Sequence, residues 1–282
     1  MSVCLVFLFS ACGSPVGEWT RGWVDGPSGP EEISYVLDAD GHWVTGGDML
    51  LTETQFLDGP PDVVFAGHYL KATTLWPNGK VPVEIHSDAE RPDLILAAMN
   101  HWNSKTAETG VSIIGRNANE PDYVKFIGGD RCASNIGRVG GGQPIYTHCG
   151  GHLDSYIHEI GHAVGLQHEH QRSDRDKYIV FYPQNVVPKY LHDFDKRKGG
   201  EEAATDVFDF QSVMFYASYA GSNGKGPVMT TVDGRHFGRG KWLSAHDVET
   251  VKHLYGPDSL TKEKPAVEVL EIEGVFIEEK AE

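Results

Sequence analysis

The stretch YIHEIGHAVGLQHEH, residues 156–170, packs four histidines and two glutamates into a short segment that also carries the apolar residues of a helix. His158 and His162 are four residues apart, so on a helix both imidazoles leave the same face. Glu159 lies beside that face and can reach a water molecule on a bound ion without binding the ion itself. The spacing therefore predicts a helix that presents a metal site.

A glycine follows this helix where the chain needs to turn. Gly165 comes three residues after His162 and permits a left-handed backbone, so the chain can bring His168 back as a third ligand. Three neutral imidazoles leave one coordination position for water, which is the arrangement of a catalytic zinc site. Zinc would lower the pKa of that water towards about 7, and Glu159 would accept its proton as general base.

The complete pattern, H-E-x-x-H-x-x-G-x-x-H, fixes five residues and is the metzincin signature, which is paired with a downstream methionine turn. Met214 in QSVMFY is the candidate for that turn. Three ligands and a water complete a zinc shell, so the other nearby histidines are interpreted as supporting or surface residues. These are His148, His152 and His170.

Length and charge limit the possible classes. The chain has 282 residues and a formal net charge of −16, enough for one large domain or two modest ones. The acidic balance argues against a nucleic-acid partner, which needs a basic face.

The first residues are typical of an export signal. Residues 1–12 are mostly apolar, and FSAC (residues 9–12) resembles a lipobox in which Cys12 becomes lipidated, although the usual basic residues are missing. The alternative is a buried N-terminal strand. We expect an exported protein, extracellular or held in the cell envelope, that meets a membrane only through this lipid. Residues 13–66, rich in Gly, Pro and acidic residues, indicate a loosely ordered pro-region rather than a second core.

Periodicity predicts further elements. Residues 81–85 alternate as a half-buried strand, and an apolar stripe predicts a helix from Pro92 that ends at Gly110. Strands are expected at VSII, at DYVKFIGG and within GRVGGGQPIYTHCGG, and helices at 153–164 and from Ser244, with a capping box, to Gly256. Residues 257–282 form a charged tail.

Two cysteines remain outside the N-terminal signal. Cys132 and Cys149 are an isolated pair, which in an exported protein usually forms a disulfide. A thiolate zinc site is the weaker alternative, because no second cysteine lies two to four residues from either one.

Over roughly residues 70–256 the chain resembles the astacin-type zinc metallopeptidases, and the lipobox-like start suggests a bacterial member. The resemblance rests on HEHQRSDRDKYI after the third histidine, SVMFY at the methionine turn, LWPNGKVPVEI, DYVKFIGGDRC and HDVETVKHLYG. Two departures stand out: Phe215 replaces the family's histidine in the turn, and the cysteines of the family's second disulfide are missing.

The resemblance implies roles for individual residues. His158, His162 and His168 would bind one Zn²⁺, with Glu159 as general base. Tyr216 would be a displaceable fifth ligand that stabilises the oxyanion. The remaining implied roles are structural: Met214 as an apolar floor, Glu169 as the contact of the new N-terminus, and a Cys132–Cys149 disulfide.

A latency device is also expected. Pro-segments of this family carry Phe-x-Gly-Asp, whose aspartate blocks the zinc; VTGGDMLL keeps Gly47 and Asp48 but has Thr45 in place of Phe. Our hypothesis is that Asp48 blocks the site; the alternatives are an ordinary Gly-Asp turn, and Asp58 as the blocking residue.

The sequence thus predicts an α+β, two-lobed metzincin-like catalytic domain at residues 67–256. Its twisted mixed sheet and two helices would carry the first two histidines. An irregular lobe from Gly165 would carry the third histidine, the methionine turn and the last helix. We expect a monomeric, latent zinc endopeptidase whose peptide or protein substrate lies along an edge strand near residues 138–146. The alternative function is a zinc-holding surface adhesion protein with a repurposed protease fold; hydrolysis of a non-peptide amide or ester also stays open.

Overall fold

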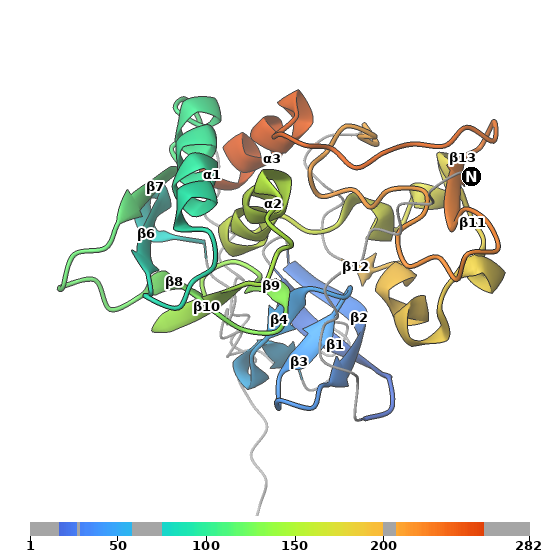
Figure 1. Ribbon diagram of the computed structural model, residues 1–282, viewed down its shortest axis with the longest axis horizontal. Coiled ribbons are helices and arrows are strands. Elements are labelled where there is room, and N and C mark those ends of the chain that lie inside the picture. The colour runs from blue at the N-terminus through green and yellow to red at the C-terminus, as the bar shows by residue number, and fades with distance from the viewer. Residues whose placement is uncertain (1–16, 27–28, 58–74, 200–206, 257–282) are drawn as a thin grey trace, which may run out of the picture.

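The computed structural model describes residues 17–26, 29–57, 75–199 and 207–256 (Figure 1). Cys12, Asp58, the boundary expected between the pro-region and the catalytic domain at residues 66 and 67, and the tail lie outside the described residues. The helices are α1 (Pro92–Lys105), α2 (Leu153–Val164) and α3 (Ala245–Tyr255). The strands are β1 (Thr20–Gly26), β2 (Gly29–Leu37), β3 (Trp43–Thr45), β4 (Met49–Leu51), β5 (Phe56–Leu57), β6 (Lys80–Ile85), β7 (Ser112–Gly115), β8 (Tyr123–Ile127), β9 (Cys132–Asn135), β10 (Gly142–Thr147), β11 (Ile179–Phe181), β12 (Lys198–Gly199) and β13 (Met229–Thr231).

Most strands belong to one mixed sheet of order β5-β1-β2-β3-β4-β9-β10-β8-β6-β7, with β12 added to β2. In its second half β6, β7, β8 and β10 run parallel, whereas β9 is antiparallel to β10. The three helices lie together beside this half of the sheet (Figure 1). The α+β class expected from the sequence is therefore confirmed.

The largest core joins this half-sheet to the helices. On α1 the apolar stripe buries Ile95, Ala98 and Trp102, and the Trp102 indole donates to the Ile157 carbonyl of α2 at 3.0 Å. The helix ends at Lys105, before the glycine expected to stop it. Burying a large aromatic with its N–H satisfied stabilises the helix pair without leaving an unpaired polar group.

Helix α3 packs into this same core, which also includes Val213 and Met214 of the irregular lobe. Its Val251, Leu254 and Tyr255 join the cluster formed by α1, α2 and β6. The Tyr255 hydroxyl donates to the Val164 carbonyl at 2.6 Å and so ties α3 to the end of α2. The last helix therefore packs against both lobes.

Between α2 and α3 the described residues have little regular structure apart from β12, the β11–β13 pair and short 3₁₀ turns. Its own core is aromatic, with Phe215 stacked on Phe237 at 4.7 Å and edge-on to Phe210. Phe215 is fully buried, so the residue that departs from the family pattern fills this core. The second lobe is therefore held by ring packing more than by backbone ladders.

The N-terminal residues are more ordered than expected. Residues 17–26 and 29–57 form β1 to β5, and they bury small apolar clusters that include Val36, Val44 and Leu50. The expectation of a loosely ordered leader was wrong for this stretch. Gly, Pro and acidic residues interrupt the apolar pattern of this stretch, and β3 to β5 are too short to show a period. Pairing with the large sheet stabilises these strands.

This N-terminal unit, residues 17–26 and 29–57, joins the rest of the sheet where β4 runs parallel to β9, with Met49 opposite Ser134 and Leu50 opposite Asn135. The edge strand expected near residues 138–146 is not at an edge, because β10 lies between β8 and β9. Strand β9 is the one that β4 covers.

Candidate active site

Helix α2 ends as its sequence predicts. Gly165 adopts φ +117°, and its N–H donates to the His162 carbonyl at 2.8 Å, while the Leu166 N–H reaches Gly161 at 2.8 Å. Such a left-handed glycine closes the helix and reverses the chain. His168 therefore returns to the face that carries His158 and His162.

Each of the three imidazoles is oriented through its Nδ1 atom. His158 Nδ1 lies 2.8 Å from the Val213 carbonyl, and His162 Nδ1 lies 2.9 Å from the Leu166 carbonyl. His168 Nδ1 lies 3.3 Å from Oε1 of Gln171. Since these partners are acceptors, Nδ1 carries the proton, and the Nε2 lone pair is left for a metal.

The Nε2 atoms converge on one carboxylate from the N-terminal unit. Asp48 Oδ2 lies 3.4 Å from His158 Nε2, and Oδ1 lies 3.4 Å from His162 Nε2 and 3.1 Å from His168 Nε2. Their ligand atoms all fall within 4.8 Å of one another. The structure thus brings together the three expected histidines and the expected blocking aspartate.

The electrostatics of this group favour a cation. Burial lowers the pKa of His158 to about 3 and also lowers the pKa of His168, so both rings are neutral at pH 7. Burial opposes ionisation of Asp48, but the imidazoles of His168, His158 and His162 outweigh burial and hold the Asp48 pKa well below its usual range. Three neutral imidazoles around an ionised carboxylate leave a negative charge that a divalent ion would balance.

The atoms that converge at this site are suited to binding zinc. His162 Nε2 and Asp48 Oδ1 are buried atoms that have no hydrogen-bond partner among the described residues, which is costly unless something else binds them. Three imidazole nitrogens and one carboxylate oxygen are the ligand types that zinc prefers in tetrahedral sites. The residues present therefore fit a single zinc ion.

Glu159 is buried next to this group. Burial, and then the negative charge of Asp48, raise its pKa well above the usual range. Its Oε1 lies 3.3 Å from the Cys132 sulfur, which cannot donate because that sulfur is in a disulfide, and its Oε2 has no partner in the described part of the chain. A carboxylate without fixed partners beside the three histidines is free to exchange a proton with a bound water.

Tyr216 reaches the same place from the second lobe. Its hydroxyl donates at 3.1 Å to Asp48 Oδ2 and lies 3.0 Å from the Gly46 carbonyl. Its ring packs on His168, with centroids 4.7 Å apart. The expected oxyanion residue is therefore in contact with the N-terminal unit.

The methionine turn is supported by a residue that sequence reasoning assigned only to a helix cap. Asp247 of α3 accepts from the Ser212 hydroxyl at 2.6 Å and from the Val213 N–H at 3.1 Å. Val213 in turn orients His158 through its carbonyl. Met214 packs under α2, where a Cβ added to Gly161 would meet its sulfur at 2.6 Å. Only tertiary contact reveals this link.

The structure also shows the surroundings of Glu169 and the pairing of the two cysteines. Glu169 accepts from the Asp209 N–H at 2.8 Å and from Arg172 at 3.3 Å, and burial raises its pKa to about 7. Cys132 and Cys149 form the expected disulfide. The partner expected for Glu169, a new N-terminus, lies outside the described residues.

The other histidines divide into two kinds. His148 and His152 are exposed. His170 is fully buried and stacks on Tyr216 at 4.1 Å and on His168 at 4.9 Å, so it supports both rings. Gln171, which holds His168, is a second supporting residue that the sequence did not indicate.

The model of the Astacin peptidase family matches residues 68–256, and the chain belongs to that family. It is 32% identical to Protein SpAN of Strongylocentrotus purpuratus over 76% of this chain and 38% of that protein. It is 34% identical to Astacin-like metalloprotease toxin 1 of Loxosceles intermedia over 64% of this chain and 66% of that protein.

The solved structure of high choriolytic enzyme 1, a hatching enzyme zinc-protease from Oryzias latipes, has 28% sequence identity and a TM-score of 0.57, covering 65% of this chain and 93% of that one. These three relatives are animal proteins and give no support to a bacterial origin. This chain spans 38% of the length of SpAN and 66% of the spider toxin. Among the described residues, no helix is long and apolar enough to cross a membrane.

Proposed function

We propose that this chain is a zinc endopeptidase. The observation that carries the proposal is the convergence of three oriented Nε2 atoms next to the buried Glu159. His158, His162 and His168 would hold the ion. When bound, zinc would supply a water of lowered pKa and polarise the scissile carbonyl.

The residues of the chain divide the remaining work. Glu159 would take the proton from the attacking water and deliver it to the leaving amine. Tyr216 would donate its hydroxyl proton to the developing oxyanion. Met214 would keep the base of the site apolar, which strengthens the electrostatic interactions above it.

The protein would be made as a latent precursor with residues 13–66 as its pro-region. Asp48 supports this, since its carboxylate faces all three histidines and accepts from Tyr216. One side chain thus engages both the metal ligands and the oxyanion donor. The family match begins at residue 68, so β1 to β5 precede it, and cleavage near Ala66 would separate them from the catalytic domain.

We also propose that the protein is exported. The Cys132–Cys149 disulfide suits an oxidising compartment, and the apolar residues 1–12 suit an export signal, with Cys12 as a possible lipid anchor. We further propose a monomer that binds peptide or protein substrate and carries residues 257–282 as a tail. The alternative, an adhesion protein with a repurposed fold, is disfavoured because adhesion does not need Glu159 or Tyr216.

The decisive variant is Glu159→Gln, which keeps the shape of the side chain but cannot act as a base. We expect peptide hydrolysis by the activated protein to fall by roughly 10²- to 10⁴-fold. Bound zinc, measured by elemental analysis, should stay at one ion per chain, and a chelator should abolish the activity of the wild type. Activity that survives Glu159→Gln would contradict the proposal.

A further inference from the structure

His170 is a buried polar side chain next to the metal site, and the chemistry proposed above does not use it. It is fully buried and lies two residues after His168. Its ring stacks on the Tyr216 ring, with centroids 4.1 Å apart and an angle of 25° between the planes. It also stacks on the His168 ring, with centroids 4.9 Å apart. One imidazole therefore contacts both a predicted zinc ligand and the predicted oxyanion donor.

Three neighbours fix the position of the His170 ring. Its Nε2 lies 3.1 Å from the Asp193 carbonyl, which is an acceptor, so Nε2 carries the proton and donates it. The His170 carbonyl accepts from Arg175 Nη1 at 2.7 Å, and the same nitrogen donates to the Phe194 carbonyl. The Phe194 ring packs against the imidazole, with centroids 5.5 Å apart. A buried ring that is held by its edge and by its backbone has few other rotamers open to it.

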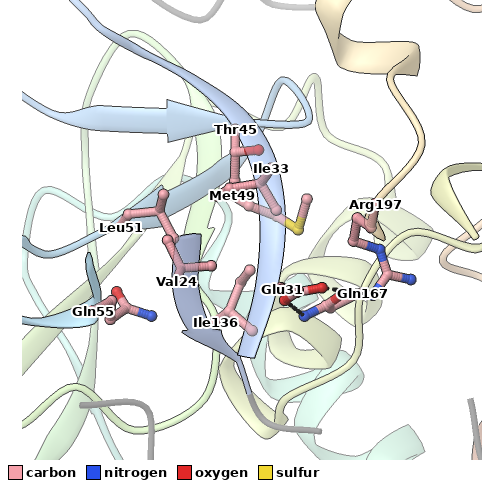
Figure 2. Close-up of a pocket in the computed structure, with 10 residues that line it drawn as sticks. All are labelled: Val24, Glu31, Ile33, Thr45, Met49, Leu51, Gln55, Ile136, Gln167 and Arg197. Carbon is pink, nitrogen blue, oxygen red and sulfur yellow. Dashed lines mark hydrogen bonds and ion pairs between the residues drawn. The ribbon is translucent and has the colours of Figure 1, made fainter. Parts of the chain in front are cut away.

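These contacts differ from those of Gln167, which also lies beside His168. Gln167 donates at 2.5 Å to Glu31 of β2, at the rim of a small cavity lined by the N-terminal unit and the catalytic part (Figure 2). Separation of the N-terminal unit would remove that acceptor. The partners of His170 described above all lie within the residues that match the family, so they would stay in place.

The Tyr216 hydroxyl, in contrast, makes hydrogen bonds to the N-terminal unit, at 3.0 Å to the Gly46 carbonyl and at 3.1 Å to Asp48 Oδ2. Removal of that unit would take away these two acceptors and leave the ring contacts of Tyr216 with His168 and His170. The ring contacts would then set the position of the hydroxyl to a larger degree. This matters because a donor to an oxyanion works only within roughly 0.5 Å of its productive position.

We propose that His170 is a positioning residue for catalysis, whose ring holds the Tyr216 phenol where its hydroxyl can stabilise the oxyanion. The inference rests on the proposed peptidase function and on the role of Tyr216 in it. Because the oxyanion forms only in the transition state, loss of the stacked ring should lower kcat and leave KM unchanged. The usual strength of an aromatic pair corresponds to a loss of about two- to tenfold.

The first test separates the ring of His170 from its hydrogen bond. His170→Gln keeps an N–H donor for the Asp193 carbonyl and removes the ring, whereas His170→Phe keeps a ring and removes the donor. In the full-length protein activated by limited proteolysis, we expect kcat for a fluorogenic peptide to fall about fivefold with His170→Gln and less than about twofold with His170→Phe. Phe237→Leu is the matched control, because Phe237 stacks at 4.7 Å on Phe215 in the same aromatic core; it should lower stability and leave kcat unchanged. A larger loss with His170→Phe than with His170→Gln would overturn the role of the ring.

The second test is a double-mutant cycle with Tyr216→Phe, which keeps the ring of Tyr216 and removes its hydroxyl. If His170 acts through that hydroxyl, His170→Gln should lower kcat about fivefold in the wild type and by no more than roughly 1.5-fold in the Tyr216→Phe variant. Bound zinc, measured by elemental analysis, should stay at one ion per chain in all of these proteins. An equal loss in both backgrounds, or loss of zinc from His170→Gln, would show that the residue acts through His168 instead and would overturn the proposal.

The outcomes distinguish this inference from the proposed function. Chelator-sensitive hydrolysis with additive effects in the cycle, or with a change in KM alone, would overturn the positioning role and leave the peptidase function intact. Absence of chelator-sensitive hydrolysis by the wild type would contradict the peptidase function, and the positioning role in that reaction would fail with it.

Discussion

The two sides of the metal site are built in different ways. His158 and His162 stand on α2, which packs in the largest core and is joined to α1 through Trp102. Asp48 follows a two-glycine turn and precedes β4, in a unit with small apolar clusters. The first side keeps its geometry through extensive burial, whereas the second depends on a few contacts that a single cut could release.

The largest effect expected from this contrast is on stability. Trp102→Ala should cost about 3–5 kcal/mol of the free energy of unfolding, because it removes a fully buried indole and its hydrogen bond to α2. Val44→Ala in the N-terminal unit should cost only roughly 2 kcal/mol. Chemical denaturation of the full chain measures both. Equal costs would show that the two parts are stabilised alike.

The next effect concerns latency. Asp48→Ala removes the carboxylate that faces the three histidines and accepts from Tyr216, so the uncut chain should gain activity by roughly 100-fold. Peptide hydrolysis by the purified full-length protein is the measurement. Asp58→Ala, which alters the reserve candidate, should have no such effect. If the Asp48 variant is as inactive as the wild type, the latency proposal fails.

A smaller effect is expected at the turn before Asp48. Gly47 has φ +95°, and an added Cβ would lie 3.0 Å from Asp193 Oδ2 and 3.1 Å from the Tyr216 hydroxyl. Gly47→Ala should therefore strain the turn by about 1–3 kcal/mol and raise the activity of the uncut chain several-fold. Gly41→Ala is the control, because Gly41 has φ +83° with open space around it. Equal activation by both would indicate general loosening.

The smallest effect is expected in the catalytic part, on the side of the metal site that helix α2 carries. Ser212→Ala removes the hydroxyl that donates to Asp247 and accepts from the Met214 N–H at 3.0 Å. We expect a loss of about 1 kcal/mol in stability and a few-fold weaker zinc binding, measured by competition with a chelator. Ser104→Ala, at an exposed position, should change neither.

The parts of the molecule that the sequence predicted well share one property. The bounds of α2, the cap of α3 by Ser244 and the left-handed Gly165 all follow from local spacing. Helix periodicity and capping are set by residues a few positions apart, so they can be inferred without tertiary structure. The three histidines were found for the same reason.

What could not be predicted depends on distant contacts. Order in residues 17–26 and 29–57 comes from pairing β4 with β9, and the packing of α3 comes from partners on α1 and α2. His170 was assigned as a supporting or a surface residue without a choice between the two, and Phe194 and Tyr216 enclose its ring. The spacing of residues in the sequence does not reveal contacts between segments that are far apart in the chain.

The parallel pairing of β4 with β9 has a consequence for the shape of the free catalytic part. Without β4, the backbone of residues 132–135 would have β10 on one side and solvent on the other. A strand in that position presents peptide groups that water satisfies and that any extended polypeptide can satisfy instead. Loss of the N-terminal strands would thus convert β9 from an interior strand into an edge strand with which another extended chain can pair.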